Sequence, residues 1–305
     1  MDGVVFFYFW RVTSANNRAG YPSEYPALSL RIQGLAPPSS FSSGNGCGGF
    51  PGAGSFAYGL DYATDVDVQD ECQGEENDRD RYCEVREITL PADRDVIGVD
   101  AVPNGGIHVE SWDRNEILVR AKVQSHADSE SDARNIVQEI EIDTSGKIEA
   151  SGPRTGHGEG WSVSFRLYVP RRSNLDLKST NGGISIENVS GEIAFRTTNG
   201  GIHLTDLAGD VQGTTTNGGV SVDLAGNRWD GDGLDVRTTN GGVRVTIPAD
   251  YNARLETGTV NGGLEIDFPV TVQGRINRKI EATLGDGGTT IRVFTTNGGV
   301  KIQRG

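Results

Sequence analysis

The acidic side chains of this sequence are the first candidates for catalytic residues. Enzymes that cleave sugar chains bring two carboxylates together on one outer face, where they act as acid, base or nucleophile. The candidates are Asp223, Asp235 and Glu265, but they occupy different positions in the surrounding pattern, so we expect that they do not converge. We therefore predict no catalytic residue. A carbohydrate-active β-helix enzyme, either a polysaccharide lyase or a hydrolase, remains the alternative hypothesis.

Metal and nucleophile motifs are weak in this sequence. The four histidines (His108, His126, His157 and His203) are scattered and lack the spacing of zinc ligands. The stretch "NRWDGDGLD" at 227–235 resembles part of a calcium loop, but it lacks the full ligand spacing and the terminal glutamate. We predict neither a metal nor a cofactor.

Trp229 lies in the loop at 227–235, and we predict that it is an exposed aromatic contact residue.

One polar phrase recurs through the second half of the chain. "TTNGG" stands at 197–201, 215–219, 238–242 and 295–299, with "STNGG" at 179–183 and "TVNGG" at 259–263. An earlier copy, "PNGG", begins at position 103, and "GDGG" at 285–288 is interpreted as a degenerate coil. A phrase that returns at near-regular spacing indicates a repeated structural unit rather than a catalytic motif.

Strand alternation explains why the phrase has this form. In "LDVRTTN" the inward-facing Leu234 and Val236 place Thr238 inward, Thr239 outward and Asn240 inward. The two glycines then turn a corner of the chain. In every copy they are followed by two aliphatic residues that are predicted to point inward, with one outward residue between them. The pattern predicts a β-solenoid in which stacked asparagines form an amide ladder at the inner edge of each corner. The members of this ladder are Asn181, Asn199, Asn217, Asn240, Asn261 and Asn297.

The residue before each asparagine forms a second, outward column. Its members are Thr180, Thr198, Thr216, Thr239 and Thr296, with Val260 in the remaining copy. A flat row of threonines is a candidate binding surface for ice or a polysaccharide. The simpler interpretation is that threonine suits β structure and stacks well on its neighbours.

The elements before the repeat are also mostly strands. "EVREITL", "DVIGVDAV", "GGIHVESW", "EILVRAKVQ" and "WSVSFRLYVP" alternate apolar and polar residues. One helix interrupts them, with a capping pair at Ser129 and Asp132 and an apolar face that begins at Ala133. We predict a domain over 83–305, in which 83–174 holds the first strands and the helix and 175–305 holds the Asn-Gly-Gly coils.

Residues 1–82 differ in composition from the rest and are predicted to be a disordered leader or linker. Cys72 and Cys83 bracket an acidic loop, and we expect them to pair if the protein is exported, leaving Cys47 unpaired. The seven apolar residues at 4–10 are too few to span a membrane, and no export signal is visible.

Charge excludes one class of partner. The chain carries 28 basic and 42 acidic residues, a net charge of −14, so phosphate backbones repel it. We therefore expect no nucleic-acid binding.

Glycine is abundant, at 43 residues, which favours turn-rich β structure over a helical bundle.

The repeated "TTNGG[IV]" coils, preceded by "SVSFRLYVPRRSNLDLKSTNGGI", resemble the bacterial putative-adhesin family, a group of domains of unknown function. This resemblance covers roughly 83–305. It implies a right-handed parallel β-solenoid, location in the cell envelope or secretion, and no established catalytic residues. The leading hypothesis is a non-enzymatic surface scaffold that binds a surface glycan or another envelope protein.

Overall fold

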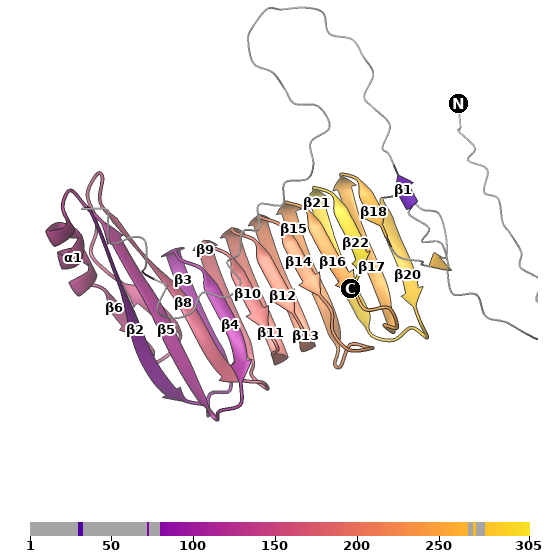
Figure 1. The fold of residues 1–305 in the computed structure, drawn as a ribbon, viewed down its shortest axis with the longest axis horizontal. Coiled ribbons are helices and arrows are strands. Elements are labelled where there is room, and N and C mark those ends of the chain that lie inside the picture. Colours follow the sequence, from indigo (N-terminus) through magenta and orange to yellow (C-terminus); the bar gives the residue numbers. More distant parts are fainter. Residues whose placement is uncertain (1–29, 33–71, 73–79, 268–270, 273–277) are drawn as a thin grey trace, which may run out of the picture.

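The computed structural model describes residues 30–32, 72, 80–267, 271–272 and 278–305. Two eleven-stranded sheets face each other along the length of the molecule (Figure 1). In spatial order, sheet A contains β1 (Leu30–Ile32), β18 (Leu264–Ile266), β22 (Val300–Arg304), β16 (Val243–Ile247), β14 (Val220–Asp223), β12 (Ile202–Thr205), β10 (Ile184–Glu187), β4 (Ile107–Trp112), β8 (Gly160–Pro170), β5 (Glu116–His126) and β2 (Arg81–Pro91).

Sheet B supplies the other face. In spatial order, it contains β19 (Thr271–Val272), β20 (Lys279–Leu284), β17 (Ala253–Asn261), β21 (Thr290–Asn297), β15 (Gly233–Asn240), β13 (Ala208–Asn217), β11 (Ser190–Asn199), β9 (Leu175–Asn181), β3 (Ile97–Asn104), β7 (Ile148–Ser151) and β6 (Glu141–Asp143). A strand of sheet B, a Gly-Gly corner and a strand of sheet A make one coil. Neighbouring coils pair in parallel, so the predicted solenoid-like stacking is confirmed, and the handedness of the winding stays a prediction.

The sequence order of the coils is not their spatial order. The coil β21–β22 lies between β15–β16 and β17–β18, because β21 pairs with both β15 and β17. Strand β20 then runs antiparallel to β17 at the end of the stack. The interpretation of 285–288 as a degenerate coil is therefore wrong. These residues form the tight connection between β20 and β21, in which Gly287 N donates to Leu284 O.

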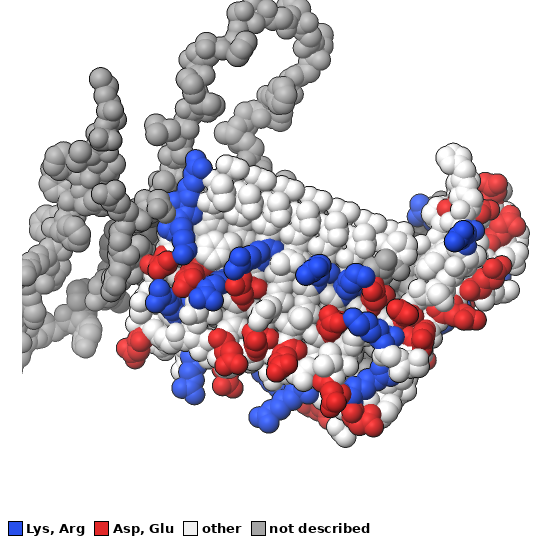
Figure 2. Space-filling model, turned by 180° about the vertical axis from the view of Figure 1, so that it is seen from behind, with Lys and Arg blue, Asp and Glu red and all other residues white. Residues whose placement is uncertain are grey.

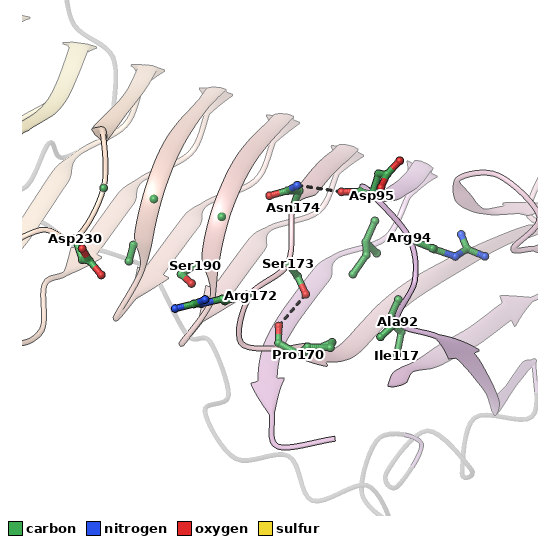
Figure 3. A pocket seen from close by; sticks show the side chains of 15 residues that line it. Ala92, Arg94, Asp95, Ile117, Pro170, Arg172, Ser173, Asn174, Ser190 and Asp230 are labelled. Atoms are coloured by element: carbon green, nitrogen blue, oxygen red, sulfur yellow. Dashed lines mark hydrogen bonds between the residues drawn. The ribbon is translucent and has the colours of Figure 1, made fainter. Parts of the chain in front are cut away.

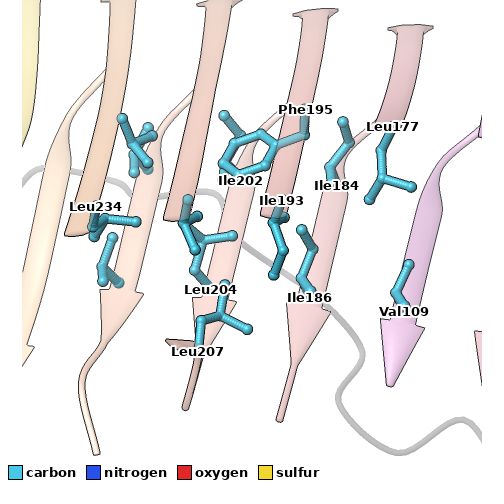
Figure 4. Packing of buried hydrophobic residues seen from close by; sticks show 14 of the residues in the cluster. Val109, Leu177, Ile184, Ile186, Ile193, Phe195, Ile202, Leu204, Leu207 and Leu234 are labelled. Carbon is cyan, nitrogen blue, oxygen red and sulfur yellow. The ribbon is translucent and has the colours of Figure 1, made fainter. Parts of the chain in front are cut away.

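The core is a column of aliphatic side chains between the two sheets. Ile193 and Phe195 of sheet B face Ile202 and Leu204 of sheet A, and all four are at least 96 % buried (Figure 4). The alternation of apolar and polar residues in each strand produces this arrangement, because every second side chain points between the sheets. The two aliphatic residues after each glycine pair point inward, as predicted.

The amino-terminal part of the domain closes the stack with antiparallel strands. Strands β2, β5 and β8 pair antiparallel, and α1 (Glu130–Gln138) packs on β2 and β5. Ser129 caps this helix by accepting from Asp132 N at 3.2 Å, as predicted, and Ala133 and Val137 are fully buried. The guanidinium of Arg86 donates to the carbonyl of Val137 near the other end of the helix.

A disulfide joins Cys72 to Cys83, which confirms the predicted pair. Most of the predicted leader, including Cys47, lies outside the described residues, so its disorder is not tested. Within that segment, β1 pairs antiparallel with β18. No helix in the described ranges is both long and apolar enough to cross a membrane.

Candidate functional site

The corner between the sheets carries the repeated phrase, and its two exposed columns form a ledge. We define the ledge as the predicted threonines (Thr180, Thr198, Thr216, Thr239 and Thr296) and the predicted asparagines (Asn181, Asn199, Asn217, Asn240, Asn261 and Asn297). Thr180 is half-buried and the other four threonines are exposed, so their predicted outward orientation is confirmed. Val260 continues the column and is 56 % exposed.

The asparagines form a continuous amide ladder on the outside of the molecule. Each Nδ2 donates to the Oδ1 of the neighbouring coil, at 2.7 Å from Asn199 to Asn181 and 2.8 Å from Asn217 to Asn199. The ladder continues through Asn240 and Asn297 to Asn261, also at 2.8 Å per step. The ladder itself was predicted, but its inner placement is wrong, because all six asparagines are exposed.

The alternation stops one residue before each asparagine. Thr197 pairs with Thr215 and Asn199 with Asn217, while the register omits the residue between them. Two consecutive side chains therefore face solvent as the chain enters the corner. Strict alternation of side chains along the strand therefore predicts the wrong side for the asparagine.

The buried polar row is instead made by the first residue of the phrase. Thr215 is 3 % exposed, and its Oγ1 donates to Gly200 O of the neighbouring coil at 2.8 Å. The same bond, at the same length, recurs in five other coils, from Ser179, Thr197, Thr238, Thr259 and Thr295. Each hydroxyl satisfies a corner carbonyl that would otherwise lack a partner.

The first glycine of each pair is required by a close approach of two backbones. A β-carbon on Gly218 would lie 2.0 Å from Gly200 O, whereas one on Gly219 would meet only Gly242 O at 3.4 Å. Neither glycine has a positive φ. Contact with the next coil, and not a left-handed backbone conformation, therefore accounts for the first glycine alone.

Charged side chains lie directly below the ledge on the outer face of sheet B. Seen from behind, this face carries a band of basic and acidic residues, and an uncharged band runs along its upper edge (Figure 2). Lys178, Arg196 and Arg237 occupy one register column of β9, β11 and β15. Lys178 pairs with Asp100 at 3.0 Å, and Arg237 pairs with Asp235 at 2.9 Å.

A hollow of about 740 Å³ lies at the end of this face, where β15, β21, β17 and β20 meet. Phe294 and Val260 line it, together with Arg237, Arg278 and Lys279. Sequence reasoning missed Phe294, although the signal was present. In "TIRVFTTN" the inward Ile291 and Val293 place Phe294 outward, where an aromatic ring is unusual.

A second hollow, of about 510 Å³, lies at the opposite corner of the coils (Figure 3). Its floor is backbone at Gly191, Gly209 and Gly231, and two of its polar side chains bond to loop carbonyls. Asn174 Nδ2 donates to Asp95 O at 3.0 Å, and Arg94 donates to Gly146 O at 2.8 Å. These two contacts hold the loops in place.

Trp229 packs into the fold beside this second hollow. The side chain is only 5 % exposed, and its Nε1 donates to Gly209 O at 2.9 Å. The prediction of an exposed aromatic contact residue is therefore wrong. The indole closes the end of the core under the loop, and its N–H satisfies a corner carbonyl. Asp230 next to it also contributes its backbone, since its O accepts from Gly209 N at 2.7 Å.

The three candidate acid-base residues do not converge. Asp223 and Glu265 lie on strands of sheet A, and Asp235 lies on sheet B. Asp235 is engaged by two nitrogens of Arg237, each at 2.9 Å. Lys301 approaches Glu265 at 3.4 Å.

The sequence profile of the Toastrack DUF4097 family matches residues 87–303. The chain belongs to this family. No curated protein matches it. Several solved structures resemble the Toastrack chain, including a putative cell adhesion protein from Clostridium sporogenes, with 11 % identity, a TM-score of 0.41 and coverage of 74 % of this chain and 100 % of that one.

Two further solved structures have similar coverage. A putative lipid binding protein from Parabacteroides distasonis is 10 % identical, with a TM-score of 0.35, and covers 72 % of this chain and 96 % of its own. A putative adhesin from Bacteroides fragilis is 11 % identical, with a TM-score of 0.30, and covers 73 % and 97 %. At these values the likenesses carry no argument about function.

Proposed function

We propose that this Toastrack protein is a non-enzymatic binding scaffold of the cell envelope or the secreted space, wound as a right-handed solenoid, and that its ledge holds an extended polysaccharide. The observation that carries the proposal is the ledge itself. Uncharged hydrogen-bonding side chains recur at the spacing of paired strands, about 4.8 Å, in a straight exposed row.

The chemistry of the ledge suits a polymer of hydroxyl groups. Threonine hydroxyls donate and accept, and a laddered asparagine still has one amide hydrogen and one carbonyl lone pair to offer. The ladder also fixes the rotamers of the asparagines, so a ligand immobilises few side chains on binding. A rigid row of this kind fits a linear chain better than a small compact ligand.

Extracytoplasmic location is supported by the disulfide between Cys72 and Cys83, because such bonds persist mainly in oxidising compartments. The non-enzymatic part of the proposal is supported by the ion pairs that engage Asp235 and Glu265 on opposite faces. A general acid or base must lie within hydrogen-bond reach of the proton that it transfers, and carboxylates on opposite faces cannot act on one substrate bond.

A glycan array probed with the whole protein tests the proposal. The double variant Thr216→Glu, Thr239→Glu places two carboxylates on the ledge without touching the core, and we expect it to lose most of the array signal. Gln303→Glu adds a carboxylate away from the ledge, on the outer face of sheet A, and should retain the signal. Equal signals from the ledge variant and the wild-type protein would contradict the proposal.

A further inference from the structure

The hollow at the end of sheet B is lined by the aromatic ring of Phe294. Phe294 pairs in register with Arg237 on one side and Gly258 on the other. A β-carbon on Gly258 would lie 2.4 Å from Arg278 O, so the close approach of the chain leading into β20 enforces glycine there. The half-buried ring of Phe294 lines the hollow together with Gly258, and Val260 adds a second apolar surface.

Three cations surround this ring. Lys279 Nζ lies 6.0 Å from the centroid of Phe294, and the side chain of Lys279 is 52 % exposed. Arg278 donates through Nη1 to Val260 O at the rim. Arg237 binds Asp235 through Nε and Nη2, which leaves its Nη1 without a hydrogen-bond partner within the described part of the chain.

The charge balance at this place is opposite to that of the whole protein. Lys279 and Arg254 share Glu281, and Arg254 and Arg292 share Glu256. With Arg237, Arg278 and Asp235, the described residues of this cluster comprise five cations and three carboxylates, a net charge of +2 in a chain whose net charge is −14. A local positive surplus on an acidic protein attracts anions selectively to that spot.

Resting on the proposed function, we propose that this hollow binds a carboxylated sugar residue of the polysaccharide, a uronate, with its ring against Phe294 and its carboxylate between Arg237 and Lys279. An apolar floor with cations at its edge matches a ligand that has one apolar ring face and one negative group. The hollow adjoins the ledge through Thr296 and Val260, so one chain can occupy both surfaces.

The test compares two forms of one ligand by titration calorimetry on the whole protein. The probes are a short oligogalacturonate and its full methyl ester, which keeps the sugar rings and removes the charge. We expect the acid to bind about tenfold tighter than the ester, which is the scale expected when one charge-assisted contact is lost. Arg237→Gln should remove that difference, and Phe294→Leu should weaken both ligands.

Two further variants separate recognition from general electrostatics. Asp235→Asn removes the carboxylate that competes for Arg237 and should tighten binding of the acid. Lys301→Gln, on the outer face of sheet A, makes the same charge change as Lys279→Gln and should leave binding unchanged, whereas Lys279→Gln weakens it. Circular dichroism melting verifies that each variant is folded.

Equal affinities for the acid and the ester, or an unchanged affinity in Arg237→Gln and Phe294→Leu, would overturn the inference. Equally tight binding of dextran sulfate would also overturn it, since that result indicates a nonspecific anion surface. If array binding is lost in the ledge variant and persists in Arg237→Gln, the polysaccharide proposal stands without the uronate site. Loss in neither variant rejects both proposals.

Discussion

Asn217 Nδ2 donates to Asn199 Oδ1 at 2.8 Å, although both side chains are exposed to solvent. The same contact joins Asn240 to Asn217, so the amide of Asn217 both donates and accepts along the stack. An exposed hydrogen bond competes with water, and its net contribution to stability is therefore modest.

Replacing Asn217 with leucine should lower the free energy of unfolding by about 1 kcal/mol, because it removes two exposed amide contacts. If the ladder were buried, the same substitution would instead lower the free energy of unfolding by several kcal/mol. Urea denaturation of the variant and the wild-type protein measures the difference. A loss well above about 3 kcal/mol would show that the amides are shielded from water.

Thr215 and Thr216 should differ in the size of their response to the same substitution. Thr215→Val keeps the shape but leaves Gly200 O without its donor in a buried place, at a cost of about 1–3 kcal/mol. Thr216→Val changes an exposed side chain and should stay within about 0.5 kcal/mol. Thermal melting of the two variants compares them directly, and equal shifts would refute the assignment of the inward threonine.

Gly218 and Gly219 should also differ. Gly218→Ala forces a methyl group to within 2.0 Å of Gly200 O, so two neighbouring coils must separate, and we expect severe destabilisation or no folded protein. Gly219→Ala meets a single atom at 3.4 Å and should cost about 1 kcal/mol or less. Soluble yield and melting temperature report both outcomes, and a stable Gly218→Ala protein would contradict the close approach.

Phe195 and Gly213 form a matched pair in the core. The phenyl ring of Phe195 fills the place where a side chain on Gly213 would lie, since a β-carbon there would come within 1.8 Å of the ring. Gly213→Ala should destabilise by about 1–3 kcal/mol through overpacking. Adding Phe195→Leu should recover part of that loss, which a double-mutant cycle measures as a coupling energy. Additive effects of the two substitutions would show that they do not share this space.

His108 should make stability depend on acidity. Burial and the nearby Arg166 lower the pKa of His108 to about 4, against the opposing effect of Glu110, so the folded protein keeps the imidazole neutral. The unfolded chain takes up the proton near its ordinary pKa of 6.5. Stability is therefore unaffected by this group above about pH 7 and declines as the pH falls from 6.5 toward 4, by about 2–3 kcal/mol in total.

Urea midpoints at pH 7.5 and pH 4.5 test this expectation in the wild-type protein and in His108→Gln. The carboxylates titrate alike in both proteins, so the difference between the two pH slopes isolates the histidine. Parallel slopes would show that His108 is protonated in the folded state.

Much of the fold was accessible from the sequence because its signals are local. The outward position of Thr239, the inward position of Thr238 and the cap at Ser129 all follow from alternation or capping rules within a few residues. The prediction that the repeated phrase forms a corner is also confirmed, since only glycine permits the contact made by Gly218.

The residues whose positions were predicted wrongly are placed by contacts outside the local sequence pattern. The outward Asn217 follows from a skipped register position between neighbouring coils, which one strand alone does not reveal. The burial of Trp229 depends on a carbonyl of Gly209 twenty residues earlier in the chain. Likewise, nothing near 285–288 indicates that the following coil enters the stack between two earlier ones.

The position of that late coil limits how this protein can grow in evolution. Each unit of a repeat protein contacts only its neighbours, so a further unit needs an unpaired edge of the stack. Here β22 is already paired with β16 on one side and β18 on the other, so a copy placed after it in the sequence would find no free edge. New coils must instead arise within the sequence, for example among the regular units around β11 and β13. A longer ledge therefore requires a coil inserted within the sequence, before the cap formed by β17, β18 and β20.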